Sequence, residues 1–453
     1  MHHQGRNRLF KKQKKIWRRV QKGSMENLLP AEITLDIFSR LPAESVLECK
    51  RVCKTWRTLL CDTHFPYMHL ERRRQLLKQP DDQYYKHNAG TNIINGGGVV
   101  AKEGLGLLFW IQFLDDCRVG LYYGQYDENK IDEQYSYKTL TKINHPLINR
   151  PNNSYVMVGS CNGLFCFTEP VYPIDDPVYI CNPIAREYVN LPRLDNISMR
   201  KYGWHSQNMV CGFGYGPSSN EYKVVRIYFC VDQPMGQVQV YTLGSGSGWR
   251  NKGKIPWSLS TFNRRVFDPP ASPGILANEA LHWMDYKEGK IVAFDLADEE
   301  FYVVTQPPCF LPAGYNEYKH CFQLQELGGC LCVVHQVRGE RVDIWSLKKT
   351  KNSTSNKMNE QEEYLSWTWS REYSIRWEGR YLDSYEPFAL TKSGAVLLWW
   401  NKSILSRYDP KTETLKMVIT ELGDMMLLYF EAIPHMNSFV SLKALGERCK
   451  TRR

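Results

Sequence analysis

The residues that could most readily do chemistry lie in the stretch CKRVCKTWRTLLCDTH, residues 49–64. It contains Cys49, Cys53, Cys61 and His64, and cysteine thiolates and histidine imidazoles are the usual ligands of structural zinc. A zinc site would require these four side chains to converge on one tetrahedral centre. The alternative is a helix whose apolar face happens to include thiols. The first arrangement would bind a metal, whereas the second would form a core or contact a partner protein.

Helical periodicity favours the second arrangement. When residues 48–60 are placed on a helical wheel at about 100° per residue, one set of apolar side chains falls within an arc of about 120°. This set consists of Cys49, Val52, Cys53, Trp56, Leu59 and Leu60. The opposite side carries Lys50, Arg51, Lys54 and Arg57. A metal site would have to displace the apolar stripe, so we expect Cys49 and Cys53 to be core side chains and predict no metal site.

Two further helical patterns precede this stretch. In LLPAEITLDIFSRL, Pro30 stands in the first turn and Glu32 lies near the helix N-terminus, where each is favourable. We expect one face of this helix to carry Ile33, Ile37, Phe38 and Leu41. LPAESVLEC repeats the arrangement with Pro42, Glu44, Val46 and Leu47. Three helices in about forty residues bury too little apolar surface to be robust alone, so the pattern predicts a partner surface.

The combined pattern closely resembles an F-box over residues 27–66, LLPAEITLDIFSRLPAESVLECKRVCKTWRTLLCDTHF. The resemblance implies three helices that dock on the Skp-type adaptor of an SCF cullin-RING ubiquitin ligase. It also implies a set of adaptor-facing and core positions, within which sequence alone does not separate interface from core. These positions are Leu29, Pro30, Ile33, Ile37, Leu41, Pro42, Val46, Leu47, Val52, Cys53, Trp56 and Leu59.

From about residue 95 the sequence changes to short β-rich runs with Gly, Asn-Pro and Asp-Pro turns. An apolar strand, a turn and a second aromatic strand recur, and comparable aromatic residues are separated by 51 to 63 residues. They are Tyr123, Tyr179, Tyr241, Phe294, Trp345 and Tyr408. Repeats of this length fit propeller blades of about four strands. Six units predict six blades, and we expect MLLYFEAIPHMNSFVSL to complete a blade with residues 99–113. A β-sandwich pair or an irregular all-β body is the alternative.

A second resemblance covers roughly residues 100–445. The ordered series GSCNGLFCF, CNPIAREYVNLP, CGFGYGPSSNEYKVVRIYF, ILANEALHWM and VDIWSLK resembles the F-box-associated interaction domain of plant F-box proteins, a domain often described as kelch-like. The resemblance implies that this domain recruits the protein to be ubiquitinated. The chain departs from the pattern by an insertion at 348–364, which we interpret as a disordered loop because it is polar and poor in apolar residues.

The predicted fold class is therefore α+β and multidomain, with a small three-helix F-box followed by an all-β, six-bladed β-propeller. The expected segments are a basic tail (1–24), the F-box (25–70), a linker (71–95), the propeller (96–445) and a basic C-terminal tail (446–453).

The net charge of +10 is concentrated at the N-terminus. Residues 1–23 carry nine basic and no acidic side chains, so the remaining 430 residues hold 49 basic and 48 acidic ones. Counterion release from nucleic acid is therefore not the evident driving force of the globular body, and we do not expect a nucleic-acid partner. The tail fits a nuclear-import signal, an RNA-binding extension or a solvated segment. Met25 is an alternative natural start.

The remaining composition argues for a nuclear or cytoplasmic protein. The chain contains no run of eighteen apolar residues, which a membrane span would need, and its basic N-terminus lacks the apolar segment of a secretory signal. The fourteen cysteines are scattered, mostly inside apolar runs. This pattern suits buried thiols in a reducing compartment better than a disulfide framework.

No motif for enzymatic catalysis is present. The chain lacks H-E-x-x-H, a P-loop and G-x-S-x-G, and His205, His282 and His320 have no ligands nearby at metal spacing. We therefore predict no catalytic residues and no cofactor. The interpretation is a substrate-recognition subunit of an SCF ligase that binds a Skp-type adaptor and an unidentified protein substrate. The alternatives are a propeller enzyme or sugar-binding module with a helical cap, and an RNA-associated protein.

Overall fold

The computed structural model describes fourteen stretches of the chain in two compact units, residues 1–102 and 103–453. In the first unit it describes residues 29–78. In the second unit it describes 105–113, 119–128, 140–143, 156–171, 174–194, 208–229, 235–259, 273–285, 288–310, 319–350, 366–401, 404–419 and 427–451. The predicted basic tail, most of the predicted linker and most of the 348–364 insertion lie outside the described residues.

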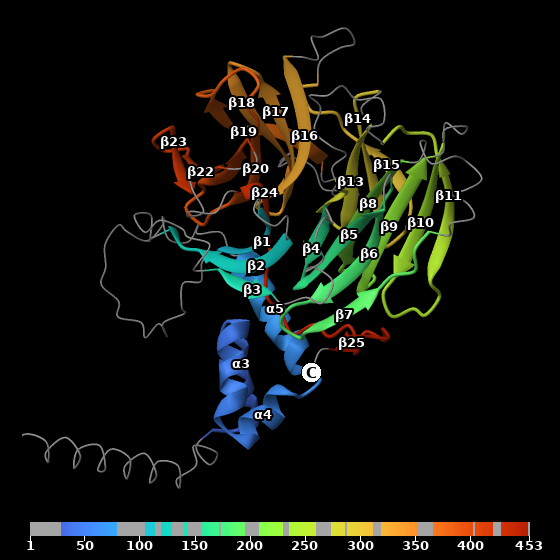
Figure 1. Ribbon diagram of the computed structural model, residues 1–453, viewed down its shortest axis with the longest axis vertical. Helices are drawn as coiled ribbons and strands as arrows, with labels where there is room; N and C mark the ends of the chain where they lie inside the picture. Colours follow the sequence, from blue (N-terminus) through green and yellow to red (C-terminus); the bar gives the residue numbers. More distant parts are fainter. Residues whose placement is uncertain are drawn as a thin grey trace, which may run out of the picture. The chain divides into compact units, whose positions relative to one another are not determined.

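The described part of the first unit contains four helices (Figure 1). They are α2 (Ala31–Ser39), α3 (Ala43–Val52), α4 (Lys54–Leu60) and α5 (Phe65–Lys78). Helix α2 follows Pro30 and α3 follows Pro42, and proline near the first turn suits a helix because its missing N–H would have had no partner there. Helix α5 extends to Lys78, whereas the sequence placed the end of the F-box at residue 70.

The single helix expected over residues 48–60 is wrong, because the structure divides it at Cys53. Cys53 is extended, with φ −150° and ψ 166°. Its Sγ accepts a hydrogen bond from the backbone N–H of Trp56 at 3.4 Å and so caps the N-terminus of α4. The break changes the direction of the chain, and Val52 at the end of α3 is left 66% exposed instead of joining an apolar stripe.

The described part of the second unit forms six sheets, which we name blades A to F, and this confirms the predicted six-bladed propeller (Figure 1). Blade A contains β24 (Leu427–Pro434), β1 (Leu105–Phe113), β2 (Val119–Tyr126) and β3 (Thr141–Ile143). Blade B contains β4 (Val156–Cys161), β5 (Leu164–Val171), β6 (Ile174–Asn182), β7 (Glu187–Asn190) and β25 (Lys450–Thr451). Blade C contains β8 (Asn208–Gly216), β9 (Glu221–Phe229), β10 (Gly236–Thr242) and β11 (Trp249–Ile255).

The other three blades each have four strands in sequence order. Blade D contains β12 (Ile275–Ala277), β13 (Ala280–Asp285), β14 (Lys290–Asp295) and β15 (Phe301–Val304). Blade E contains β16 (His320–Leu327), β17 (Cys330–Val337), β18 (Arg341–Thr350) and β19 (Ser366–Arg376). Blade F contains β20 (Tyr385–Leu390), β21 (Val396–Trp400), β22 (Ile404–Asp409) and β23 (Thr414–Ile419). Neighbouring strands within each blade pair antiparallel.

The repeated aromatic residues occupy equivalent positions in the ring. Each lies on the third strand of its blade, counted from the centre: β2, β6, β10, β14, β18 and β22. The expected ring closure is also confirmed, because β24 pairs antiparallel with β1 from Leu107 opposite Pro434 to Phe113 opposite Leu427. The C-terminal strand is thus the innermost strand of blade A, and chain ends far apart in sequence complete one sheet.

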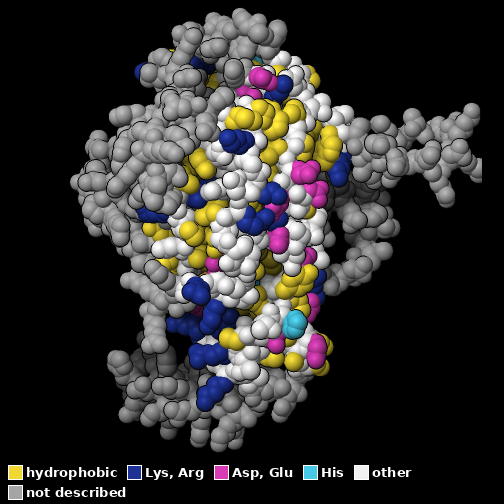
Figure 2. All heavy atoms as spheres, turned by 90° about the vertical axis from the view of Figure 1, so that its right-hand side faces the viewer, with side chains coloured by type: hydrophobic (Ala, Val, Ile, Leu, Met, Phe, Trp, Pro, Cys, Tyr) yellow, Lys and Arg dark blue, Asp and Glu magenta, His cyan; other side chains and the backbone are white. Residues whose placement is uncertain are grey.

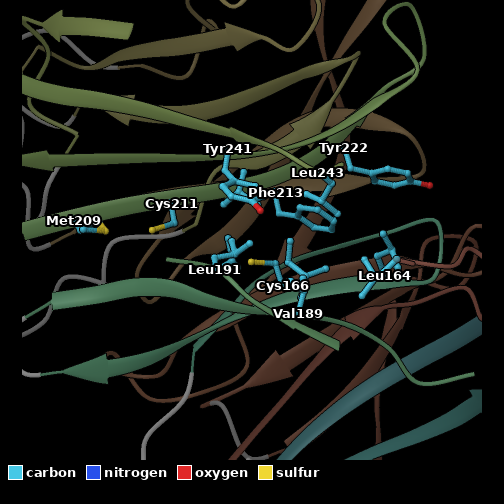
Figure 3. Close-up of a cluster of buried hydrophobic side chains, with 14 of the residues drawn as sticks. Leu164, Cys166, Val189, Leu191, Met209, Cys211, Phe213, Tyr222, Tyr241 and Leu243 are labelled. Carbon is cyan, nitrogen blue, oxygen red and sulfur yellow. The ribbon is translucent and has the colours of Figure 1, made fainter. Parts of the chain in front are cut away.

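Apolar clusters between neighbouring blades hold the ring together. In Figure 3, Leu164, Cys166 and Val189 of blade B point toward Phe213 and Tyr241 of blade C. Comparable clusters of buried side chains join blades C and D, D and E, E and F, F and A, and A and B. A blade cannot bury both faces alone, so each one depends on its two neighbours.

The residues after β24 pack onto blades B and C, and the segment predicted as a basic C-terminal tail, residues 446–453, includes a short strand. Lys450 pairs with Tyr188 and Thr451 with Glu187, so β25 adds a fifth strand to blade B. Before it, Leu442 is fully buried in the cluster between blades B and C, and the Glu447 carboxylate accepts hydrogen bonds from Tyr241 and Gly244. We call residues 435–451 the C-terminal strap.

Charged side chains are mixed on the surface. Figure 2 shows acidic and basic side chains interspersed among hydrophobic ones, with a run of Lys and Arg toward the lower end of the view. Within the described stretches, every helix is too short or too polar to cross a membrane.

Buried histidines predict a pH-dependent stability. Burial lowers the pKa of His282, His335 and His435 from 6.5 to about 4, so all three are neutral in the folded propeller at neutral pH. In the unfolded chain each of these histidines binds a proton near pH 6.5. The stability that comes from keeping them neutral is therefore fully present above that pH and is lost as the pH falls toward 4. Each histidine contributes on the order of 3 kcal/mol to this loss by pH 4.

We expect the melting temperature to fall between pH 6.5 and pH 5, where carboxylates of ordinary pKa remain charged. His282→Met, which replaces one buried imidazole by an apolar side chain of similar length, should flatten this fall. Thermal unfolding followed by circular dichroism measures both effects. An equally steep fall in the variant would contradict a neutral, buried His282.

Candidate functional site

The most distinctive surface of the helical unit is one side of α2 and the residues before it. Leu29, Ile33 and Ile37 recur every fourth residue and are 43%, 47% and 45% exposed. Residues four apart lie on the same face of a helix, so Ile33 and Ile37 form an apolar stripe on α2, and the exposed Leu29 lies just before the first residue of that helix. Large aliphatic side chains exposed together are costly in water and mark an interaction site. We call these three residues the α2 stripe.

The other side of α2 is buried inside the unit. Phe38 is 4% exposed and packs edge-to-face on Trp56, with ring centroids 4.9 Å apart. The expectation that Ile33, Ile37, Phe38 and Leu41 share one face is therefore wrong. On a helix, Ile33 and Phe38 are separated by about 140°, so α2 carries apolar residues on two sides. One side forms the core and the other faces solvent.

Polar contacts fix α2 against α5. The Asp36 carboxylate pairs with Arg72 of α5 at 3.2 Å, and the His69 Nε2 lies 2.9 Å from the carbonyl oxygen of Leu41. Burial lowers the pKa of His69 to about 4, so this imidazole is neutral and donates its N–H to that carbonyl at neutral pH. These contacts fix α2 against α5, while the α2 stripe remains exposed to solvent.

The structure separates the twelve predicted adaptor-binding positions by exposure. The exposed ones are Leu29, Pro30, Ile33, Ile37 and Val52. The half-buried ones are Leu41, Pro42, Leu47, Cys53, Trp56 and Leu59. Val46 is fully buried and belongs to the core. The exposed and half-buried positions remain candidates for the adaptor interface.

Helix α5 adds two exposed apolar residues that the sequence analysis missed. Tyr67 is 65% exposed and Met68 is 36% exposed. Phe65, His69 and Leu70 of the same helix are buried, and this spacing is an amphipathic signal that could have identified the helix from the sequence.

The thiols do not gather into a metal centre. Cys49 and Cys53 are half-buried, while Cys61 and His64 are exposed. The expectation that Cys49 and Cys53 are core side chains therefore holds only in part, and Cys53 serves as a helix cap. Across the ranges that the structure describes, no three His, Cys, Asp or Glu side chains are placed to hold a metal ion together.

The propeller histidines singled out by the sequence have structural surroundings. His282 is 2% exposed on β13, and its Nδ1 lies 3.2 Å from the carbonyl oxygen of Ile275. The His320 Nδ1 lies 2.9 Å from the His335 Nε2, and the two rings stack. His205 lies outside the described residues.

Comparisons with known proteins agree with this division of the chain. An F-box-like family model matches residues 27–70. A model described as F-box associated beta propeller domain matches residues 125–426, which is more than half of the chain.

Similar proteins come from Arabidopsis thaliana. The F-box protein At3g07870 is 27% identical and the match covers 91% of this chain and 90% of that protein. The F-box/kelch-repeat protein At3g23880 is 25% identical, with 71% of this chain and 76% of that protein covered. The F-box protein CPR1 is also 25% identical, with 71% of this chain and 70% of that protein covered.

Proposed function

The chain belongs to the F-box proteins that carry an F-box associated beta propeller domain, and on this premise we propose that it is the substrate-recognition subunit of an SCF-type cullin-RING ubiquitin ligase. The helical unit binds a Skp-type adaptor, which links it to the cullin-RING scaffold. The propeller binds a target protein. The proposed location is the nucleus, the cytoplasm or both.

The α2 stripe is the observation that carries this proposal. The helical unit buries Phe38 and Val46 as its own core, yet leaves Leu29, Ile33 and Ile37 exposed to solvent. Exposed apolar side chains of this kind are stabilised when a partner protein covers them and removes them from water. A protein adaptor with an apolar groove has the chemistry to do so, in the way that an amphipathic helix is held by a groove.

The proposed mechanism is positional and requires no catalytic residue in this chain. Binding of a target to the propeller places target lysines near the ubiquitin-charged enzyme on the scaffold. The transfer then proceeds at the high effective concentration that a tethered pair of reactants experiences. The ubiquitin-conjugating machinery performs the chemistry, and this chain determines which protein is modified.

The test is a comparison of the full chain with the propeller unit, residues 103–453. We expect the full chain, but not the propeller unit, to co-purify with the Skp-type adaptor and cullin. Proteins captured by both forms are candidate targets. In a reconstituted ligase, excess propeller unit should slow ubiquitination of such a target by the full chain, because it binds the target without delivering it. Chemical modification of a target by the isolated propeller would show that it is an enzyme instead.

A further inference from the structure

One loop of the propeller exposes two neighbouring apolar side chains. It joins β19 of blade E to β20 of blade F and consists of residues 377–384, WEGRYLDS. Tyr381 is 48% exposed and Leu382 is 65% exposed, the latter value among the highest for large apolar side chains in the described residues. We call residues 377–384 the E–F loop.

Hydrogen bonds to one carboxylate fix the conformation of the E–F loop. Asp383 accepts from the backbone N–H of Arg380 at 2.7 Å, from the Trp400 indole at 3.0 Å and from the Asn401 amide at 2.8 Å. Burial alone would raise the pKa of Asp383, but the hydrogen bonds from Asn401 and Trp400 lower it below its ordinary value. The carboxylate is therefore charged at neutral pH and holds the loop on β21.

Aromatic rings at the two ends of the E–F loop pack together and fix it further. Tyr385 is fully buried and stacks on Trp400 at 5.6 Å between centroids, and its ring also packs at a tilt against Trp377 at 4.7 Å. The Trp377 indole donates to the carbonyl oxygen of Arg380 at 3.0 Å. Gly379 fits closely here, because a Cβ at this position would lie 2.2 Å from a carboxylate oxygen of Asp383. The two exposed side chains are thus presented by a pre-organised loop, which lowers the entropic cost of binding.

Basic side chains flank the apolar pair. Arg376 and Arg380 are exposed, and among the described residues the Arg376 guanidinium forms neither an ion pair nor a hydrogen bond. Arg376 lies directly opposite Arg341 in the β18–β19 pair. Arg341 is paired with Asp343 at 3.0 Å and with Glu340 at 3.7 Å, so Arg376 is the member of this pair whose charge is available to an anionic ligand.

The β17–β18 turn extends the same edge of the propeller. A Cβ on Gly339 would lie 3.5 Å from the Tyr381 ring, and the N–H of Trp377 bonds to the carbonyl oxygen of Glu340. Charged side chains accessible along this edge are the basic Lys319, Arg338, Arg341, Arg376 and Arg380 and the acidic Glu340, Glu378 and Asp383. Glu340 is already paired with Lys319. The surface around Tyr381 and Leu382 is therefore basic.

We propose that the E–F loop, with Arg376 beside it, is a recognition surface for an acidic protein segment that carries an exposed apolar side chain. Carboxylates of the segment pair with Arg376 and Arg380, and its apolar side chain packs on Tyr381 and Leu382. This inference rests on the proposed function, since it names the class of target segment that the propeller would bind.

A protein segment fits this surface better than RNA does. Single-stranded RNA stacks successive bases on several aromatic side chains, whereas the exposed pair of this loop offers one aromatic ring, Tyr381, beside the aliphatic Leu382. The exposed Glu378 carboxylate interrupts the basic side chains of this edge, which disfavours a continuous phosphate backbone. An acidic peptide can place its few carboxylates opposite the arginines alone.

The test uses the full chain in complex with its Skp-type adaptor. The probes are arrays of synthetic twelve-residue peptides that combine Asp or Glu with Leu or Phe, the same peptides with Lys in place of the acids, peptides with Ser in place of the apolar residue, and a single-stranded RNA of twelve nucleotides. The variants are Arg376→Glu/Arg380→Glu and Tyr381→Ser/Leu382→Ser. Lys411→Glu/Lys416→Glu is the matched control, because it makes the same change of net charge at exposed residues of blade F outside the loop.

We expect the wild-type complex to prefer acidic-apolar peptides by about 10-fold or more over both altered peptide sets. Each loop variant should lose that preference, while the control should retain it within about two-fold. The inference is overturned if the wild type shows no preference, if both loop variants bind as the wild type does, or if RNA binds more tightly than the peptides. Adaptor capture is measured in the same preparations. Absence of a peptide preference in the wild-type complex, with the adaptor retained, refutes only this inference, whereas failure of the full chain to capture the adaptor refutes the proposed function.

Discussion

Replacing Trp56 with alanine should lower the free energy of unfolding of the helical unit by about 3 kcal/mol, the lower end of the range for truncating an aromatic core residue. The lower end applies because Trp56 is half-buried. Its ring packs edge-to-face on Phe38 at 4.9 Å, and that contact ties α4 to the buried side of α2. The loss should also weaken adaptor binding, because α2 would no longer hold its exposed stripe in place.

Chemical unfolding of the helical unit and adaptor affinity measure the two effects. Lys54→Ala is the control, since the Lys54 side chain is exposed in the same helix and its loss removes no core contact. Unchanged adaptor affinity together with unchanged helical stability in Trp56→Ala would refute this position of the tryptophan.

Removing residues 427–453 should abolish the cooperative fold of the propeller. The deletion takes away β24, which pairs with β1 along its length, and with it the C-terminal strap. Leu442, which is fully buried between blades B and C, and Phe439, which is 7% exposed, are lost with the strap. Blades A, B and C would then expose apolar clusters to water, and the inner side of β1 would lose the partner with which it pairs along its length.

Near-ultraviolet circular dichroism and limited proteolysis should reveal this loss as an absent tertiary signal and rapid cleavage. Removal of Arg452 and Arg453 alone is the control, because this deletion leaves β25 and the strap intact. A truncated chain that retained a single sharp unfolding transition would contradict closure of the ring by β24.

The propeller was predictable because its repeats carry a residue-level signal. Tyr179, Tyr241 and Phe294 recur at blade spacing because each fills the same place on the third strand of its blade. The apolar segment at the C-terminus had no partner nearby in the sequence, so its pairing with the N-terminal strand followed from the need to close a ring. Both expectations depend on patterns that local physical chemistry imposes.

The details that failed depend on contacts that no local pattern encodes. The wheel over residues 48–60 assumed one helix, and the cap formed by Cys53 divides it. The two apolar sides of α2 appear as one pattern in sequence, and only the position of Phe38 against Trp56 separates them. The strap is fixed by contacts between segments far apart in the chain, such as Glu447 with Tyr241, and the E–F loop is fixed by side-chain hydrogen bonds to Asp383.

The central claim, that the exposed side of α2 binds the Skp-type adaptor, is tested most directly by Ile33→Glu/Ile37→Glu in the full chain. Both side chains face solvent, and glutamate is a good helix former, so the fold should be unaffected while charge is placed in the interface. Thr58→Glu, at an exposed position of α4, is the matched control. The measurement is adaptor affinity by titration, with circular dichroism of the same samples. We predict a loss of at least about 30-fold in the double variant and less than about two-fold in the control; wild-type affinity in a correctly folded double variant would contradict the claim.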